Sequence, residues 1–231
     1  MLTLILYLYL KKHYFAGRRS RAVLADNLFT KSYPALYAGL MMLLLLLLPK
    51  LSESQNTQLN YSIIQGKNHV GWLSIEKKLN GNRTTLTLTS EVKTRIIVPI
   101  NVYTKEVSTY ESGQLIFSST SRKTNGNTKL NKQTKLEGAN YVVCKNGNRQ
   151  DLAISFIGTN LLSLYFREPV GVTQVYCETP ESFSNVIKTG DGSYKVTFKN
   201  GDSNNFYYSN GVCSKVKIRH TFFSAEIILK P

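Results

Sequence analysis

Apolar and polar side chains alternate along several segments of the chain, which is the period of a β-strand with one buried face. The clearest segment is 214–222, in which one face carries Val216, Ile218, His220 and Phe222, and the other carries Lys215, Lys217, Arg219 and Thr221. Segments 83–90, 98–102 and 194–198 alternate in the same way. The pattern predicts strands that turn one face to a core and the other to water.

Turn signals separate these segments. Asn-Gly or Asp-Gly pairs begin at Asn80, Asn125, Asn146, Asp191, Asn200 and Asn210. Both pairs readily adopt the positive φ angles that two-residue hairpin turns require. The chain is therefore expected to be all-β and mainly antiparallel, as a curved open sheet, a half-barrel or a sandwich with one short helix.

That helix is expected in residues 159–166, "TNLLSLYF". Thr159 can cap its first turn, Leu161, Leu164 and Tyr165 fall on one face, and Pro169 stops it. The prediction is a helix of two turns that covers one face of the sheet.

The leader, residues 1–54, contains the apolar run 38–48. This run is about half as long as the roughly 20 residues that a membrane-spanning helix needs. Pro49 follows, and Ser52 and Ser54 provide the small residues that a signal peptidase requires, so cleavage is expected between Ser54 and Gln55. Residues 55–231 then form one exported domain, periplasmic or secreted. An uncleaved N-terminal membrane anchor is the alternative, because a second apolar stretch, 2–10, precedes several basic residues.

The formal net charge of +15 favours encounters with polyanions such as anionic lipid or polysaccharide. Arg122, Lys123, Lys129, Lys132 and Lys135 form a run without acidic residues, and Lys215, Lys217 and Arg219 could extend it. Such lysines could equally protect a sheet edge from pairing with another chain. The run lacks aromatic residues that would stack on bases, so no nucleic-acid partner is expected.

Motifs for catalysis, metals and cofactors are lacking. His220 lies on an apolar strand face, so it is a weak catalytic candidate beside Glu226 or Cys213. Glu106 follows Lys105 and is interpreted as part of a surface ion pair, whereas the Arg167-Glu168 pair directly after the predicted helix is expected to fix that helix to the sheet. The segment 200–205, "NGDSNN", lacks the glutamate of a calcium loop and predicts a polar turn. No catalytic, metal or cofactor residue is assigned. Cys144, Cys177 and Cys213 allow at most one disulfide and are expected mainly as small buried side chains.

Four segments carry a resemblance: "VGWLSIEKK" (70–78), "SEVKTR" (90–95), "NLLSLYFREPV" (160–170) and "YYSNGVCSKVKIRHTFFSAEIIL" (207–229). Over residues 61–229 the chain resembles an uncharacterised family of secreted bacterial proteins, a domain of unknown function. The resemblance implies export and one mainly β domain, and it brings no activity. The layout is also similar to curved half-barrels such as periplasmic lipoprotein carriers, an analogy of fold alone.

The sequence therefore predicts a non-catalytic envelope protein for binding or scaffolding. A second hypothesis is a carrier that holds an acyl chain under Leu161, Leu164 and Tyr165 while Lys215, Lys217 and Arg219 contact head groups. Such a carrier needs an open apolar pocket. Two further hypotheses are a hydrolase of an envelope polymer built around His220 and a domain that pairs with a protein partner through an exposed strand.

Overall fold

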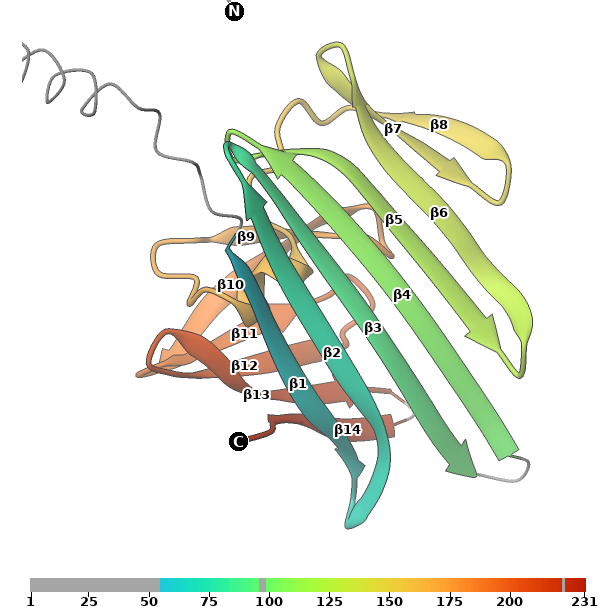
Figure 1. The fold of residues 1–231 in the computed structure, drawn as a ribbon, viewed down its shortest axis with the longest axis vertical. Helices are drawn as coiled ribbons and strands as arrows, with labels where there is room; N and C mark the ends of the chain where they lie inside the picture. The colour runs from blue at the N-terminus through green and yellow to red at the C-terminus, as the bar shows by residue number, and fades with distance from the viewer. Residues whose placement is uncertain (1–54, 96–98, 222) are drawn as a thin grey trace, which may run out of the picture. The chain divides into compact units, whose positions relative to one another are not determined.

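A computed structural model describes residues 55–95, 99–221 and 223–231. These residues form one antiparallel sheet of 14 strands (Figure 1). The strands are β1 (Asn56–Gln65), β2 (Asn68–Asn80), β3 (Arg83–Arg95), β4 (Pro99–Glu111), β5 (Gln114–Thr124), β6 (Asn127–Glu137), β7 (Asn140–Lys145), β8 (Asn148–Leu152), β9 (Gln174–Cys177), β10 (Ser182–Gly190), β11 (Ser193–Thr197), β12 (Ser203–Ser209), β13 (Val212–His220) and β14 (Phe223–Leu229). The expected all-β, antiparallel fold class is confirmed, with an open sheet as its form.

The hairpins follow the predicted turn signals. All six Asn-Gly and Asp-Gly pairs lie at connections between neighbouring strands. At Asn125-Gly126, Asn146-Gly147 and Asn210-Gly211 both residues have positive φ angles, as a tight two-residue turn requires. The turn at Ser112-Gly113 has the same backbone conformation, although the sequence pattern did not indicate it.

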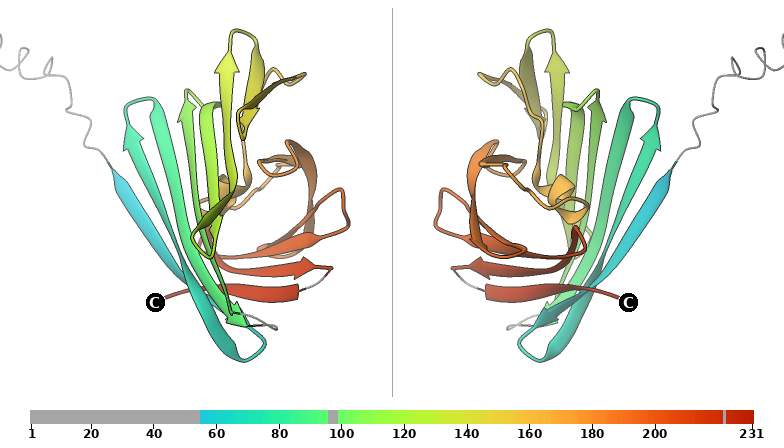
Figure 2. Two further views of the ribbon diagram at one scale, coloured as in Figure 1. Left: turned by 90° about the vertical axis from the view of Figure 1, so that its right-hand side faces the viewer. Right: turned by 90° about the vertical axis from the view of Figure 1, so that its left-hand side faces the viewer.

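The strand order is a meander that returns on itself. It runs β8-β7-β6-β5-β4-β3-β2-β1-β14-β13-β12-β11-β10-β9, so the first strand pairs with the last. In this pairing Tyr61 lies opposite Leu229. The sheet therefore has two halves, β1–β8 and β9–β14, which face each other across the interior and whose strands run in different directions (Figure 2). Residues 153–173 connect the halves along the chain.

The core lies between these two halves. Tyr61, at the junction, is fully buried, and its hydroxyl donates to the Cys213 carbonyl oxygen at 2.8 Å. The ring centroid of Tyr165 lies 5.4 Å from that of Tyr61 and 6.0 Å from that of Phe206, both edge to face. Such aromatic pairs add about 0.5–1.5 kcal/mol each beyond the area that they bury. One aromatic residue from the connecting segment thus joins the two halves of the sheet.

The predicted two-turn helix is shorter than expected. It is a 3-10 helix, η1 (Leu161–Tyr165), between the two halves, in contact with β3, β9 and β13 (Figure 2). Asn160 caps it instead of Thr159: the Asn160 Oδ1 accepts from the Ser163 backbone N–H, and the Ser163 hydroxyl accepts from the Asn160 backbone N–H. Asn160 can cap because its backbone is extended and because a hydrogen bond from its Nδ2 to the Ser108 hydroxyl oxygen fixes its side chain.

The open edges of the sheet are short. The edge strand β8 exposes Asn148, Arg149, Gln150 and Asp151, a charged strip that discourages pairing with another chain. At the other edge, residues 159–160 cover β9, because the Tyr176 N–H donates to the Thr159 carbonyl oxygen at 2.9 Å. Among the described strands, β8 is therefore the outer strand that lacks such a cover.

The leader and its predicted cleavage site after Ser54 lie outside the described residues. The described residues form one compact unit. No helix within the described ranges is both long and apolar enough to cross a membrane. All three cysteines are free thiols; Cys177 and Cys213 are buried as expected, whereas Cys144 is exposed.

Candidate functional site

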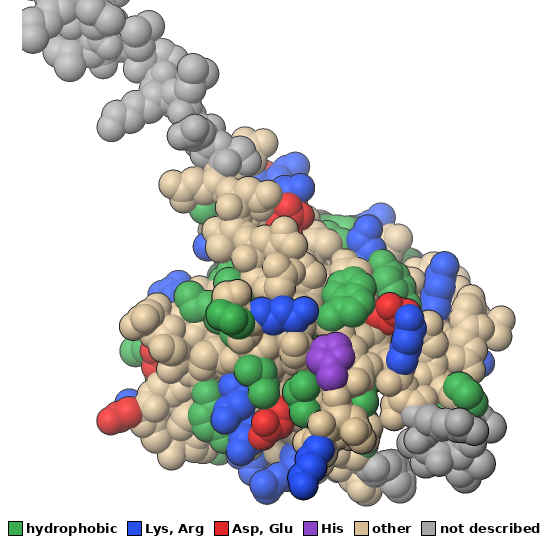
Figure 3. All heavy atoms as spheres, turned by 60° about the horizontal axis from the view of Figure 1, so that its bottom comes forward, with side chains coloured by type: hydrophobic (Ala, Val, Ile, Leu, Met, Phe, Trp, Pro, Cys, Tyr) green, Lys and Arg blue, Asp and Glu red, His purple; other side chains and the backbone are tan. Residues whose placement is uncertain are grey.

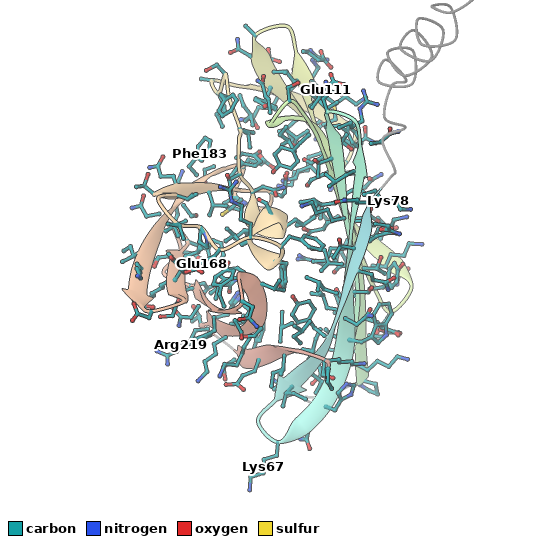
Figure 4. The ribbon with its side chains drawn as sticks, turned by 60° about the vertical axis from the view of Figure 1, so that its left-hand side comes forward. Lys67, Lys78, Glu111, Glu168, Phe183 and Arg219 are labelled. Carbon is teal, nitrogen blue, oxygen red and sulfur yellow. The ribbon has the colours of Figure 1, made fainter. Side chains whose placement is uncertain are left out.

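A pocket of about 520 Å³ lies between η1 and the two halves of the sheet. Its lining comes from β3, β4, β5, η1, the β9–β10 and β11–β12 turns, β12 and β13. Ligand pockets typically measure about 300–1,000 Å³. The space between the halves is mostly occupied by side chains (Figure 4), so this pocket is a local opening in a packed interior.

The larger part of the pocket wall is apolar. It consists of Leu88, Leu161, Leu162, Tyr165, Phe198, Phe206 and Ile218. Leu162, Tyr165 and Phe206 are buried core residues, which makes this wall rigid. Leu161 is only half-buried, so it is the η1 side chain that can adapt to an occupant. The wall suits an alkyl or aromatic body.

Glu106 lines the pocket from β4. On β4 it shares a face with Thr104, Ser108 and Tyr110, all of which are buried, whereas Lys105 is exposed on the other face. The interpretation of Lys105 and Glu106 as a surface pair is therefore wrong, since successive residues of a strand point to opposite sides. Burial, together with the neighbouring Glu178, raises the pKa of Glu106 to about 7.

Glu178 follows β9 and is 5% exposed. Its Oε2 accepts from the Ser118 hydroxyl at 2.9 Å, and its Oε1 accepts from the Asn160 Nδ2 at 3.4 Å. The same Nδ2 donates to the Ser108 hydroxyl oxygen at 2.7 Å. Burial raises the pKa of Glu178, and the Ser118 hydrogen bond and the charge of Lys132 partly oppose this effect. Glu178 is thus a structural carboxylate with partners from β5 and from the residue that caps η1.

Lys132 is the most deeply buried charge on β6, with 1% of its side chain exposed. Its Nζ lies 3.6 Å from Glu181 Oε1, and the nearby Glu178 carboxyl group also favours the charged form of Lys132. Burial lowers the pKa of Lys132, although both carboxylates counteract this. The predicted basic run is therefore not one surface: Lys132 points inwards, Arg122 lines the pocket, and five strands separate β5 from β13.

His220 lines the opposite side of the pocket, on β13. Its Nδ1 lies 3.4 Å from Asp202 Oδ2, and its ring packs on Phe223 at 4.7 Å between centroids. Asp202 belongs to the predicted polar turn 200–205, where its carboxylate accepts from the Thr221 backbone N–H at 2.9 Å and from the Asn200 Nδ2 at 2.7 Å.

Neither partner suggested for His220 lies beside it. Glu226 pairs with Lys217, 3.4 Å away, and Cys213 is buried near the other end of β13. Burial also raises the pKa of the Cys213 thiol to about 12 and that of Cys177 to about 11, so both thiols are poor nucleophiles.

The predicted ligand-contact residues separate into two groups. Leu161 and Tyr165 line the pocket, and Leu164 is buried beside it in the core. Lys215, Lys217 and Arg219 lie on the strand face opposite to Ile218 and His220, and Arg219 points away from the interior (Figure 4). These three side chains do not reach the pocket. The face in Figure 3 shows basic side chains interspersed with acidic, apolar and polar ones.

The corner after η1 has the structural role that its sequence suggested. Glu168 accepts a hydrogen bond from the Tyr194 hydroxyl at 2.8 Å, and the Tyr208 hydroxyl donates to the Leu164 carbonyl oxygen at 2.8 Å. Both bonds fix the connecting segment to β11 and β12. Within the described ranges, no group of three or more His, Cys, Asp and Glu side chains has the arrangement of a metal site.

The open, antiparallel β domain with a pocket under η1 defines the structural class of this protein. A family model for a domain of unknown function, DUF6134, matches residues 61–230, and the chain belongs to this family. The resemblance to an uncharacterised family is thereby confirmed. Neither the curated proteins nor the solved structures contain a match to the chain.

Proposed function

We propose that this protein is an exported, non-catalytic binding protein of the cell envelope, and that it holds an acyl or lipid-like molecule in the pocket under η1. The observation that carries the proposal is an opening of about 520 Å³ whose wall is mainly apolar and also contains charged groups. An amphipathic molecule matches both parts of this lining.

Export is part of the same proposal and rests on the sequence of the leader. The first strand begins at Asn56, one residue after the N-terminus that cleavage at Ser54 would create. Cleavage there would leave every described strand intact. N-terminal sequencing of the mature protein, with Gln55 as the expected first residue, tests this step.

The binding proposal is tested with N-phenyl-1-naphthylamine, a neutral apolar probe whose fluorescence increases in an apolar pocket. The purified protein should bind one equivalent, and dodecanoate should displace it. Leu161→Trp would fill the pocket from the half-buried face of η1 and should weaken probe binding by about tenfold or more.

Ile187→Trp is the matched control, because Ile187 is 55% exposed and lies outside the pocket. It adds the same side chain and should leave probe binding unchanged. Equal loss in both variants, or no saturable binding by the parent protein, would contradict the proposal.

A hydrolase is the second candidate function, and Glu106 favours it. A carboxyl group with a pKa of about 7 could act as a general acid, and Glu178 lies at the same pocket. This candidate predicts turnover of chromogenic glycosides or esters that is abolished in Glu106→Gln. Absence of turnover in the parent protein would leave the binding function alone.

A further inference from the structure

The charged groups that line the pocket differ in whether the protein already provides them with hydrogen-bond or ion-pair partners. Glu178 accepts from Ser118 and Asn160, and Asp202 accepts from Thr221 and Asn200. Both carboxylates therefore already accept hydrogen bonds from donors of the protein itself. A bound cation would have to compete with these donors, so neither group is a free anion for a ligand.

Arg122 is in the opposite situation. It lies on β5, opposite Thr104 of β4, which makes it a diagonal neighbour of Glu106 on the same face of the sheet. Among the described residues, no carboxylate oxygen lies within 4 Å of the Arg122 guanidinium, which is the limit for an ion pair. The Arg122 side chain is nevertheless half-buried at the pocket. A guanidinium in this position can form two parallel hydrogen bonds to a carboxylate.

Glu106 does not neutralise Arg122 when it is protonated. Four titratable groups act on this carboxyl: Glu178 from the β9–β10 turn, Arg122 on β5, Lys132 on β6 and, from η1, the Tyr165 hydroxyl. Because its pKa is raised to about 7, a large share of Glu106 is neutral at pH 7 and nearly all of it at pH 5. In that form it donates a hydrogen bond instead of offering a negative charge.

We infer that the pocket binds an acyl chain with a carboxylate head group, and that the carboxylate lies on Arg122 with the Glu106 carboxyl as a second donor. The apolar wall of Leu88, Leu161 and Phe206 would take the chain. A head group with one negative charge matches the single charge of Arg122, whereas a doubly charged phosphate would also face the Glu178 and Asp202 carboxyl groups that line the pocket. This inference rests on the proposed binding function and specifies its ligand.

The test compares four twelve-carbon ligands with different head groups on the parent protein: dodecanoate, dodecyl phosphate, dodecylamine and dodecanol. Each displaces N-phenyl-1-naphthylamine at pH 6.5. Dodecanoate should bind at least about tenfold more tightly than dodecanol and dodecylamine. Tightest binding of dodecylamine would overturn the inference, and tightest binding of dodecyl phosphate would overturn the choice of a carboxylate.

Variants then locate the head group. Arg122→Gln should weaken dodecanoate binding about tenfold or more while the affinity for the neutral probe stays the same. Glu106→Gln keeps a donor and should retain dodecanoate binding within about threefold, with less dependence on pH between 5.5 and 8. Lys123→Gln is the matched control, because Lys123 is exposed on the other face of β5.

The result separates the two levels of the proposal. If the neutral probe does not bind, the proposed function fails. If the probe binds but Arg122→Gln binds dodecanoate like the parent protein, only the head-group inference fails. Should Arg122→Gln not fold, the comparison of the four ligands on the parent protein decides the question without a variant.

Discussion

At the scale of single residues, Glu106 makes stability depend on pH. Its pKa is about 7 in the folded protein against an ordinary value of 4.5, so the folded state holds the additional proton between these two pH values. The free energy of unfolding must therefore fall as pH rises through this window, by up to about 1.4 kcal/mol per pH unit. Burial of this carboxyl group thus costs stability at neutral pH.

Glu106→Gln should remove this cost. We expect the variant to be more stable than the parent protein by about 1–3 kcal/mol at pH 7.5 and nearly equal to it at pH 4.5, measured by urea unfolding. Glu226→Gln, on the outer surface next to Lys217, should keep the slope of the parent protein. Parallel stability curves for Glu106→Gln and the parent protein would contradict the role of Glu106.

The same residue explains what sequence reasoning missed at the site. Glu106 follows Lys105, and Lys132 belongs to a run of basic residues, so local charge alone places both on the surface. Alternation along the strand carries the correct signal, since Glu106 falls on the face of Tyr110, and Lys132 on the face of Thr134. Glu178 could not be found in this way, because its contacts come from Ser118 and Asn160, which lie far from it in the sequence.

At the scale of elements, η1 depends on Asn160. This side chain is fully buried, caps the helix through the Ser163 N–H, and holds Ser108 and Glu178. Asn160→Ala should cost about 2–4 kcal/mol, because it removes a cap and leaves buried polar groups without partners.

Thr159→Ala is the control for this prediction and should cost less than about 0.5 kcal/mol. Thr159 offers the capping side chain that the sequence suggested, but the extended backbone of Asn160 gives that role to the next residue. Thermal or urea unfolding of both variants measures the difference. A larger loss for Thr159→Ala than for Asn160→Ala would contradict the assigned cap.

The hairpins were the elements that sequence predicted best, for a local physical reason. At Asn125-Gly126 and Asn210-Gly211 the backbone must adopt positive φ angles, and these residue pairs adopt them with little strain. The pairing of β1 with β14 lacks any such local signal. Apolar alternation fits several strand orders, so the order had to come from the structure.

At the scale of the whole molecule, the strand order suggests a circular permutation of the sequence that should keep the fold. The Lys230 N–H donates to the Asn60 carbonyl oxygen at 2.8 Å, so the C-terminal end runs beside β1. A linker of about five residues could span from Pro231 to Gln55, at about 3.4 Å per residue. New ends between Val170 and Gly171, both exposed, would then give a protein whose strand order follows the chain from one edge of the sheet to the other.

This circular permutant, 171–231, linker, 55–170, should fold to the same β-rich circular dichroism spectrum. Its free energy of unfolding should remain within about 2 kcal/mol of the parent protein, because exposed loops tolerate new ends. It should also fold faster, since neighbouring strands are then adjacent in the sequence. An unfolded or helical product would contradict the strand order.

The pairing of β1 with β14 also governs what happens while the protein is being made. The ribosome releases Tyr61 early, and the backbone of Cys213 that receives its hydroxyl, like Leu229 opposite it, emerges only near the end of translation. A growing chain therefore cannot complete the packing around Tyr61 before synthesis is almost finished. Until then the Tyr61 hydroxyl lacks the acceptor that it has in the folded protein.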